Sequence, residues 1–210
     1  MFLTFRIAAL AAPVAAALTA NPLETAAAAT GVACVWLAAR NAVWNFPVAI
    51  VSSGLYLLVF AQARLYSDAG LQLAFVALNG YGWWQWRGRG PATAALPITG
   101  TGAGLGGALL AAGGLYAAGA GYLFAHYTDA ALPYYDSATT AVSLAAQYLL
   151  ARRKIENWLL WLGVDVVYVG MYWHRGLALT SGLYAVFLGL AAYGYRQWRR
   201  EQTAHRALAA

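Results

Sequence analysis

The chain has 210 residues, of which 62% are hydrophobic and only 10% are charged, and its formal net charge is +6. Its mean hydropathy is +0.56, whereas soluble domains carry about 25% charged residues. Too few charges are present to cover a water-facing surface, and this excludes an ordinary soluble domain, a disordered chain and a nucleic-acid-binding protein. A single cysteine, Cys34, excludes a disulfide framework and a cysteine-rich zinc or redox site.

Seven apolar stretches are long enough to cross a bilayer. A spanning helix needs about 20 mostly apolar residues, because the hydrocarbon layer is about 30 Å thick and each helical residue rises about 1.5 Å. Charged residues, glycines and prolines fall between these stretches, where the chain is expected to meet water. The predicted spans are 23–39, 43–63, 66–86, 97–124, 134–151, 155–173 and 177–197.

The two ends of the chain carry different signals. Arg6, followed by a short apolar run with Pro13 in it, is typical of a signal peptide, an interfacial helix or an eighth span. We favour a retained helix, interfacial or spanning, over residues 1–22. With seven spans, ten of the 13 Lys and Arg residues fall on one side, which the positive-inside rule places in the cytoplasm together with the C-terminus. The basic tail 201–210 then contacts anionic lipid and needs no nucleic acid as a partner.

The sequence repeats itself at an offset of 112 residues. Residues 39–87 align with 151–199 without a gap, and 14 of the 49 pairs are identical, where about four are expected by chance. Both copies end in Tyr-Gly-x-x-Gln-Trp-Arg, at 81–87 and at 193–199. The repeat predicts two related bundles of three helices.

A single helix between the bundles makes their corresponding helices run in the same direction. The expected fold class is therefore all-α, a polytopic membrane protein with a 3+1+3 helix bundle and parallel repeats, arranged as in the SWEET sugar transporters. A substrate site is expected between the two halves, near the midplane. The predicted segments are 1–22 (extra helix), 23–90 (first bundle), 91–125 (connector helix), 126–200 (second bundle) and 201–210 (basic tail).

The predicted span 155–173 carries a face with unusual chemistry. Trp158, Trp161, Asp165 and Tyr168 recur at steps of three, four and three, which places them on one side of a helix. A mid-span carboxylate is costly in lipid, so it should face a cavity. Aromatic rings around an anion favour a flat cationic or polar heterocycle, because such rings stack on it and attract cations. The alternative is a tryptophan belt in which Asp165 only ties helices together.

The predicted span 66–86 adds amide groups. Asn79 and Gln85 can both donate and accept hydrogen bonds. The repeat places Ala191 opposite Asn79, and this asymmetry favours a ligand role for Asn79. The other polar groups within predicted spans are interpreted as hydrogen bonds between helices: Gln72, Ser52, Ser53, Asn45 and Gln147.

Enzymatic chemistry finds little support. His126, His174 and His205 are scattered, and the sequence has neither a phosphate-binding GxxxxGK motif nor HExxH. We expect no metal, no cofactor and no catalytic residue. A non-transporting membrane enzyme or subunit that uses Asp165 is the alternative from another class, but it would lack a second carboxylate and a nucleophile–base pair.

Two blocks of residues carry a family resemblance. Lys-Ile-Glu-Asn-Trp-Leu-Leu-Trp at 154–161 is followed by Val164-Asp165 and Gly170-x-Tyr172, and Leu-Asn-Gly-Tyr-Gly-Trp-x-x-Trp stands at 78–86. Over about 23–200 the chain resembles the PnuC family of bacterial vitamin-precursor transporters. The resemblance implies a SWEET-like fold in the bacterial inner membrane, and facilitated diffusion of nicotinamide riboside that cytoplasmic phosphorylation traps. Related branches carry thiamine or riboflavin, so thiamine is the alternative substrate.

The resemblance also implies how the protein works and with which partners. Uptake would proceed by alternating access, in which the two bundles rock around the site. The expected partners are a small-molecule vitamin, the lipid bilayer, a cytoplasmic kinase as a functional link and, in one alternative, a second copy of the chain. The implied substrate-binding residues are Trp158, Trp161, Asp165, Asn79 and Tyr81, with Gln85, Asn157 and Tyr168 as further candidates.

Overall fold

The computed structural model describes residues 22–62, 66–87, 96–128, 132–174 and 178–209; most of these residues are helical, and none belongs to a β-strand. Each of the seven predicted spans overlaps one helix, so the all-α prediction is confirmed, although the last helix continues to Ala209, beyond the predicted end of its span at 197. The predicted N-terminal helix over 1–22 lies, apart from its last residue, outside the described residues. The helices are α2 (Pro22–Ala39), α3 (Asn45–Gln62), α4 (Tyr66–Trp86), α5 (Ala103–Tyr127), α6 (Pro133–Ala151), α7 (Asn157–His174) and α8 (Ala178–Ala209).

Charges at the helix ends give the bundle an acidic end and a basic end. The first turns of α2, α4 and α6 contain Glu24, Asp68 and Asp136, where a carboxylate interacts favourably with the helix dipole. Basic residues follow the last turns of the same helices at the opposite end. We call that side the basic end and define it by Arg40, Arg87, Arg152, Arg153 and Lys154.

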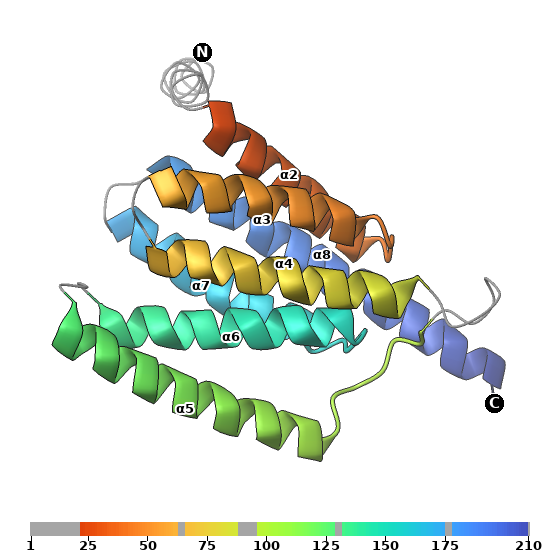
Figure 1. Cartoon of the computed structure of the whole chain (residues 1–210). Helices are drawn as coiled ribbons and strands as arrows, with labels where there is room; N and C mark the ends of the chain where they lie inside the picture. Colours follow the sequence, from red (N-terminus) through yellow and green to blue (C-terminus); the bar gives the residue numbers. More distant parts are fainter. Residues whose placement is uncertain (1–21, 63–65, 88–95, 129–131, 175–177, 210) are drawn as a thin grey trace, which may run out of the picture.

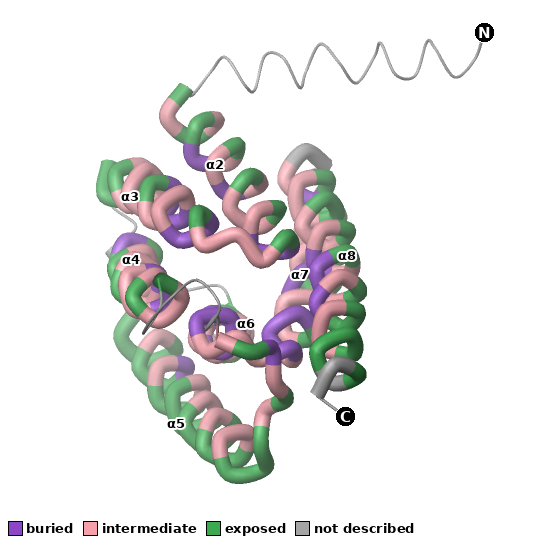
Figure 2. Tube along the Cα trace, turned by 90° about the vertical axis from the view of Figure 1, so that its right-hand side faces the viewer, coloured by how far each residue is buried: buried purple, intermediate pink, exposed green. Residues whose placement is uncertain are grey.

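Six helices form a closed ring, and α5 lies outside it. Helix α3 packs on both α2 and α4, and helix α7 packs on both α6 and α8; we call these two groups of three the first and second bundles. The bundles meet where α4 packs on α6 and α2 packs on α8, while α5 packs on α6. Successive helices run in opposite directions (Figure 1), and most of α5 is exposed (Figure 2). Three helices, α2, α3 and α5, are long and apolar enough to cross a membrane by length and composition alone.

The connector helix begins later than its predicted span, which started at residue 97. Pro97 lacks a backbone N–H, and Gly100 and Gly102 disfavour helix, so residues 97–102 run extended instead. Thr99 pairs there with the turn between α6 and α7: its N–H donates to the Arg153 carbonyl at 3.1 Å, and its own carbonyl accepts from Ile155 at 3.0 Å.

The Glu156 carboxylate strengthens this attachment. It accepts from the Thr101 backbone at 2.8 Å and from the Thr101 hydroxyl at 2.7 Å. Lys154 adds a bond from its ammonium group to the Thr99 hydroxyl at 2.8 Å. The chain entering α5 is therefore fastened to the second bundle.

The turn after the first helix is the same in both bundles. Asn41 and Arg153, which are 112 residues apart, both have a left-handed backbone, with φ of 60° and 50°. The Asn45 and Asn157 side chains, also related by the offset, each donate to the carbonyl three residues earlier, at 2.7 and 2.6 Å. The repeat found in the sequence therefore corresponds to repeated local structure.

A tryptophan from each bundle reaches across to the other at the basic end. Trp86 Nε1 donates to the Ala151 carbonyl at 3.1 Å, and Trp198 Nε1 donates to the Ala38 carbonyl at 3.0 Å. The centres of the two rings lie 5.8 Å apart. The Arg153 guanidinium lies 4.3 Å from the centre of the Trp86 ring. Burial lowers the pKa of Arg153, although the Glu201 carboxylate opposes this shift. We call Trp86 and Trp198 the tryptophan pair.

Candidate functional site

A cavity of about 530 Å³ lies inside the helix ring. Residues from all six ring helices line it, and none from α5 does. Its size falls in the range of small-molecule sites, about 300–1,000 Å³. We call it the central cavity.

Helix α7 supplies an aromatic wall with one carboxylate. Trp161, Asp165, Tyr168 and Tyr172 line the cavity at helical spacing, as the sequence pattern predicted. Asp165 is only 5% exposed, and among the described residues none forms a hydrogen bond or ion pair with its carboxylate. Tyr184 from α8 extends the wall, with its ring centre 4.7 Å from that of Tyr168 and 5.4 Å from that of Tyr172. A buried carboxylate among aromatic rings suits a flat cation.

Helices α4 and α6 supply an amide wall. Asn79 and Gln147 are 3% and 7% exposed, respectively, and both line the cavity. The Gln147 amide nitrogen donates to Asn79 Oδ1 at 2.8 Å. Asn79 Nδ2 in turn donates to the Phe75 carbonyl at 2.9 Å. The two amides therefore form a connected hydrogen-bonded unit across the contact between the bundles.

Five of the predicted site residues come together at the cavity. Trp158 is the most enclosed of them: it is 1% exposed, and its indole nitrogen has no acceptor among the described residues. Its ring also packs so closely on Gly194 that a Cβ there would lie 2.6 Å from it. Trp158 therefore combines a packing role with its place in the cavity wall. The five residues are Trp158, Trp161, Asp165, Tyr168 and Asn79.

Three other predicted site residues lie outside the cavity wall. Gln85 donates to the Tyr81 hydroxyl at 2.6 Å, and the Tyr81 ring stacks 6.2 Å from that of Tyr148. Asn157 is fully buried and bonds the Lys154 carbonyl. In this structure these side chains hold local geometry and do not face the cavity.

Several lining residues escaped the sequence prediction of the site. Gln147 was interpreted only as a contact between helices, although Thr140, Ser143 and Gln147 share one face of α6 at steps of three and four, and all three line the cavity. Identity between the two repeats could also have indicated lining positions, because Phe187 and its counterpart Phe75 are the same residue type and both line the cavity.

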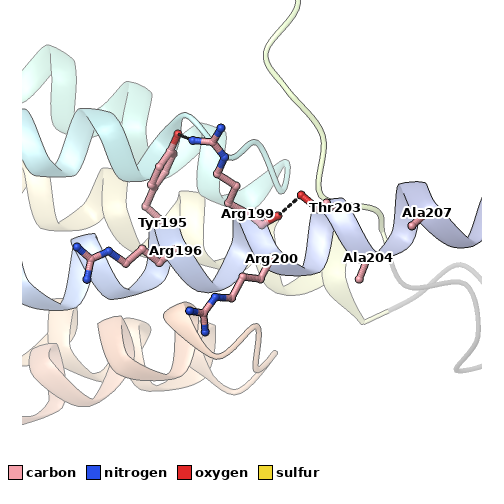
Figure 3. Close-up of a pocket in the computed structure, with 7 residues that line it drawn as sticks. All are labelled: Tyr195, Arg196, Arg199, Arg200, Thr203, Ala204 and Ala207. Atoms are coloured by element: carbon pink, nitrogen blue, oxygen red, sulfur yellow. Dashed lines mark hydrogen bonds between the residues drawn. The ribbon is translucent and has the colours of Figure 1, made fainter.

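A second hollow, of about 610 Å³, lies on the outer surface of α8. Its walls carry Arg196, Arg199 and Arg200 (Figure 3). Arg199 donates to the Tyr195 hydroxyl at 3.3 Å, while Arg196 and Arg200 extend to the other side of the helix. Three guanidinium groups would repel a cation, so this hollow does not suit the ligand that the central cavity favours. Among the described residues, no group of three histidine, cysteine or acidic side chains could hold a metal ion.

Comparisons with known proteins identify the family to which the chain belongs. The family model described as nicotinamide mononucleotide transporter matches residues 21–200. The riboflavin/roseoflavin transporter RibM of Streptomyces davaonensis is 30% identical over 171 residues, covering 80% of each chain. The nicotinamide riboside transporter PnuC of Escherichia coli is 25% identical over 202 residues, covering 84% of each chain.

A solved structure shares the fold. A crystal structure of the vitamin B3 transporter PnuC superposes with a TM-score of 0.70 at 25% identity, over 91% of this chain and 87% of that one. These relatives are transporters and not enzymes, which confirms both the resemblance to the PnuC family and the prediction that the chain is no enzyme. The chain belongs to the nicotinamide mononucleotide transporter family, whose PnuC members are integral membrane proteins that transport nicotinamide riboside.

Proposed function

We propose that this protein is a bacterial inner-membrane facilitator that takes up nicotinamide riboside, with the central cavity as its substrate site. The buried Asp165 carboxylate carries this proposal: it shares the cavity wall with aromatic rings and has no hydrogen-bond or ion-pair partner among the described residues. Nicotinamide riboside has a flat, permanently cationic pyridinium ring that would neutralise the carboxylate and stack on Trp161. Riboflavin is neutral and would leave that buried charge uncompensated, so we favour nicotinamide riboside although the riboflavin carrier RibM is also similar.

Transport would proceed by alternating access in a 3+1+3 arrangement with parallel bundles. Helices α2, α4, α6 and α8 run the same way (Figure 1), which supports two parallel repeats linked by α5. Because the chain before α5 is fastened to the turn between α6 and α7, the connector would move with the second bundle. The first bundle would rock against this unit around the cavity.

Direction of uptake follows from charge and from metabolism. The positive-inside rule places the basic end, and with it the C-terminus, in the cytoplasm. A facilitator only equilibrates its substrate, so net uptake requires a downstream step. Phosphorylation by a cytoplasmic kinase would supply that step, because it adds negative charge and removes the transported form.

A thermal-shift screen of purified protein tests the substrate. Nicotinamide riboside should raise the melting temperature more than riboflavin does, and Trp161→Ala should abolish the shift while the protein stays folded, because the stacking surface is lost. Stabilisation by thiamine alone would indicate the thiamine branch, whose substrate is also cationic. Stabilisation by riboflavin alone would reject the proposal, as would an unchanged shift in Trp161→Ala.

A further inference from the structure

We propose that Gln147 recognises the carboxamide of the substrate, and that Asn79 is a positioning residue that fixes the orientation of Gln147. This inference rests on the function proposed above. It adds to that function a residue that selects for a hydrogen-bond donor on the ring. The two amides lie at the contact between α4 and α6, on the cavity wall.

The orientation of both amides follows from one acceptor. The Phe75 backbone carbonyl can only accept, so the Asn79 group that bonds it at 2.9 Å is the amide nitrogen. Asn79 Oδ1 then points the other way and must receive a donor. Gln147 supplies that donor through Nε2 at 2.8 Å. The chain of bonds therefore leaves Gln147 Oε1 as the group free of this network.

Gln147 Oε1 is available to a ligand. No described residue donates a hydrogen bond to this oxygen. It is also not one of the fully buried side-chain atoms that lack a hydrogen-bond partner, so it remains accessible. Because Gln147 lines the central cavity, this oxygen can accept a hydrogen bond from a molecule inside. A primary carboxamide offers an N–H for that purpose, whereas a methyl ketone of the same size does not.

The repeat-related positions of the two amides cannot take this role. The offset of 112 relates Gln147 to Val35 and Asn79 to Ala191, and both counterparts line the cavity. Neither side chain has a polar atom, so a carboxamide facing them would bury an N–H without a partner, which is unfavourable. Of these two repeat-related pairs, only the amides on α4 and α6 can bond the carboxamide, while Asp165 on α7 compensates the charge of the ring.

Two ligands that differ by one group test the inference. Nicotinamide riboside and 3-acetylpyridine riboside are both cationic and nearly the same size, but only the first has a carboxamide N–H. In the unaltered protein we expect the acetyl compound to bind about tenfold more weakly, as measured by calorimetry, because Gln147 Oε1 is left without a donor. Near-equal binding would overturn the inference and leave the proposed function standing.

Variants then assign the effect to the two amides. Gln147→Met should bring the two affinities to within about threefold of each other, because the acceptor is gone. Asn79→Leu should also narrow the difference, because Gln147 can then turn its N–H toward the acetyl oxygen. A purely structural role would weaken both ligands equally, so an unchanged ratio in either variant would overturn the role assigned to that residue.

Ser52→Ala is the matched control. Ser52 is buried and donates to the Ala27 carbonyl at 2.9 Å, but it does not line the cavity. Its loss should lower the melting temperature and leave the ratio of the two affinities unchanged; a changed ratio would show that the ratio reports general destabilisation and would defeat the inference. If the unaltered protein binds neither compound, the proposed function fails together with the inference. If it binds both compounds about equally, only the inference fails.

Discussion

At the basic end the two bundles share a set of repeated aromatic contacts, whereas around the central cavity they diverge. A Cβ added to Gly82 would overlap the Phe46 ring, and one added to Gly194 would lie 2.6 Å from the Trp158 ring. Those two rings meet the tryptophan pair edge-on in both bundles, at centre distances of 4.9 and 5.5 Å. Each glycine, ring and tryptophan is related to its counterpart by the offset of 112.

The cavity breaks this symmetry. The offset relates Trp161 to Ala49 and Asp165 to Ser53 on the second helix of each bundle. At four cavity positions the polar or large side chain therefore stands on α4, α6 or α7, and a smaller or apolar one stands at the repeat-related place on α8, α2 or α3: Asn79/Ala191, Gln147/Val35, Trp161/Ala49 and Asp165/Ser53. Repeated contacts between the bundles suit two units that move against each other. The substrate has no such symmetry, so its binding site needs different side chains on the two bundles. The repeated contacts hold the bundles together, and the diverged positions bind.

Removing the charge at the most diverged position should have the largest effect. Asp165→Asn keeps the size of the side chain but removes the anion, and a lost buried charge pair weakens binding by about 2 kcal/mol or more, equivalent to about 30-fold. We expect at least that loss for nicotinamide riboside, and none for a neutral heterocycle, by calorimetry. Ser53→Ala, at the repeat-related position, should change affinity less than about threefold. Equal losses in the two variants would contradict the division between repeated and diverged positions.

The sequence predicted the fold better than the site because the two depend on different information. Apolar length and the offset of 112 are properties of the chain itself, and they located every helix of the ring. The site depends also on which helix faces meet. Helical spacing showed that Trp161, Asp165 and Tyr168 share a face, but Gln147 could equally have bonded a helix away from the cavity.

On α4, helix geometry separates two of the predicted site residues. Asn79 and Tyr81 are two residues apart, so their side chains differ by about 200° around the helix and cannot both face one cavity. The structure places Asn79 in the wall and Tyr81 against Tyr148. The resemblance had suggested both residues, because similarity along a block does not distinguish its faces.

Filling the close contacts at the basic end should cost stability equally in both bundles. Gly82→Ala and Gly194→Ala each force a methyl group into an aromatic ring, and overpacking of this kind costs about 1–3 kcal/mol. We expect both variants to have a lower melting temperature in detergent. Size-exclusion chromatography of heated samples measures this change. Gly80→Ala is the control, because a Cβ there would meet nothing within 4 Å. A loss confined to one bundle would show that the resemblance between their contacts is only apparent.

The smallest expected effect concerns the hydrogen bonds of the tryptophan pair. Trp86→Phe and Trp198→Phe keep an aromatic ring but remove the N–H that crosses to the other bundle, and each should weaken the contact by about 1 kcal/mol. If the basic end opens during transport, the chain's single cysteine, Cys34 in the cavity wall, should then react about fivefold faster with a maleimide. Saturating nicotinamide riboside should slow that reaction.

Trp84→Phe provides the comparison for this measurement, because Trp84 is 60% exposed and lies outside the cavity wall. It should leave Cys34 reactivity unchanged. The two donors are related by the repeat, and their acceptors, Ala151 and Ala38, lie in the last turns of α6 and α2. Trp86→Phe and Trp198→Phe should therefore accelerate the reaction to a similar extent. Acceleration by only one of the two variants would mean that one hydrogen bond controls the opening. The two similar contacts would then stabilise the closed basic end unequally.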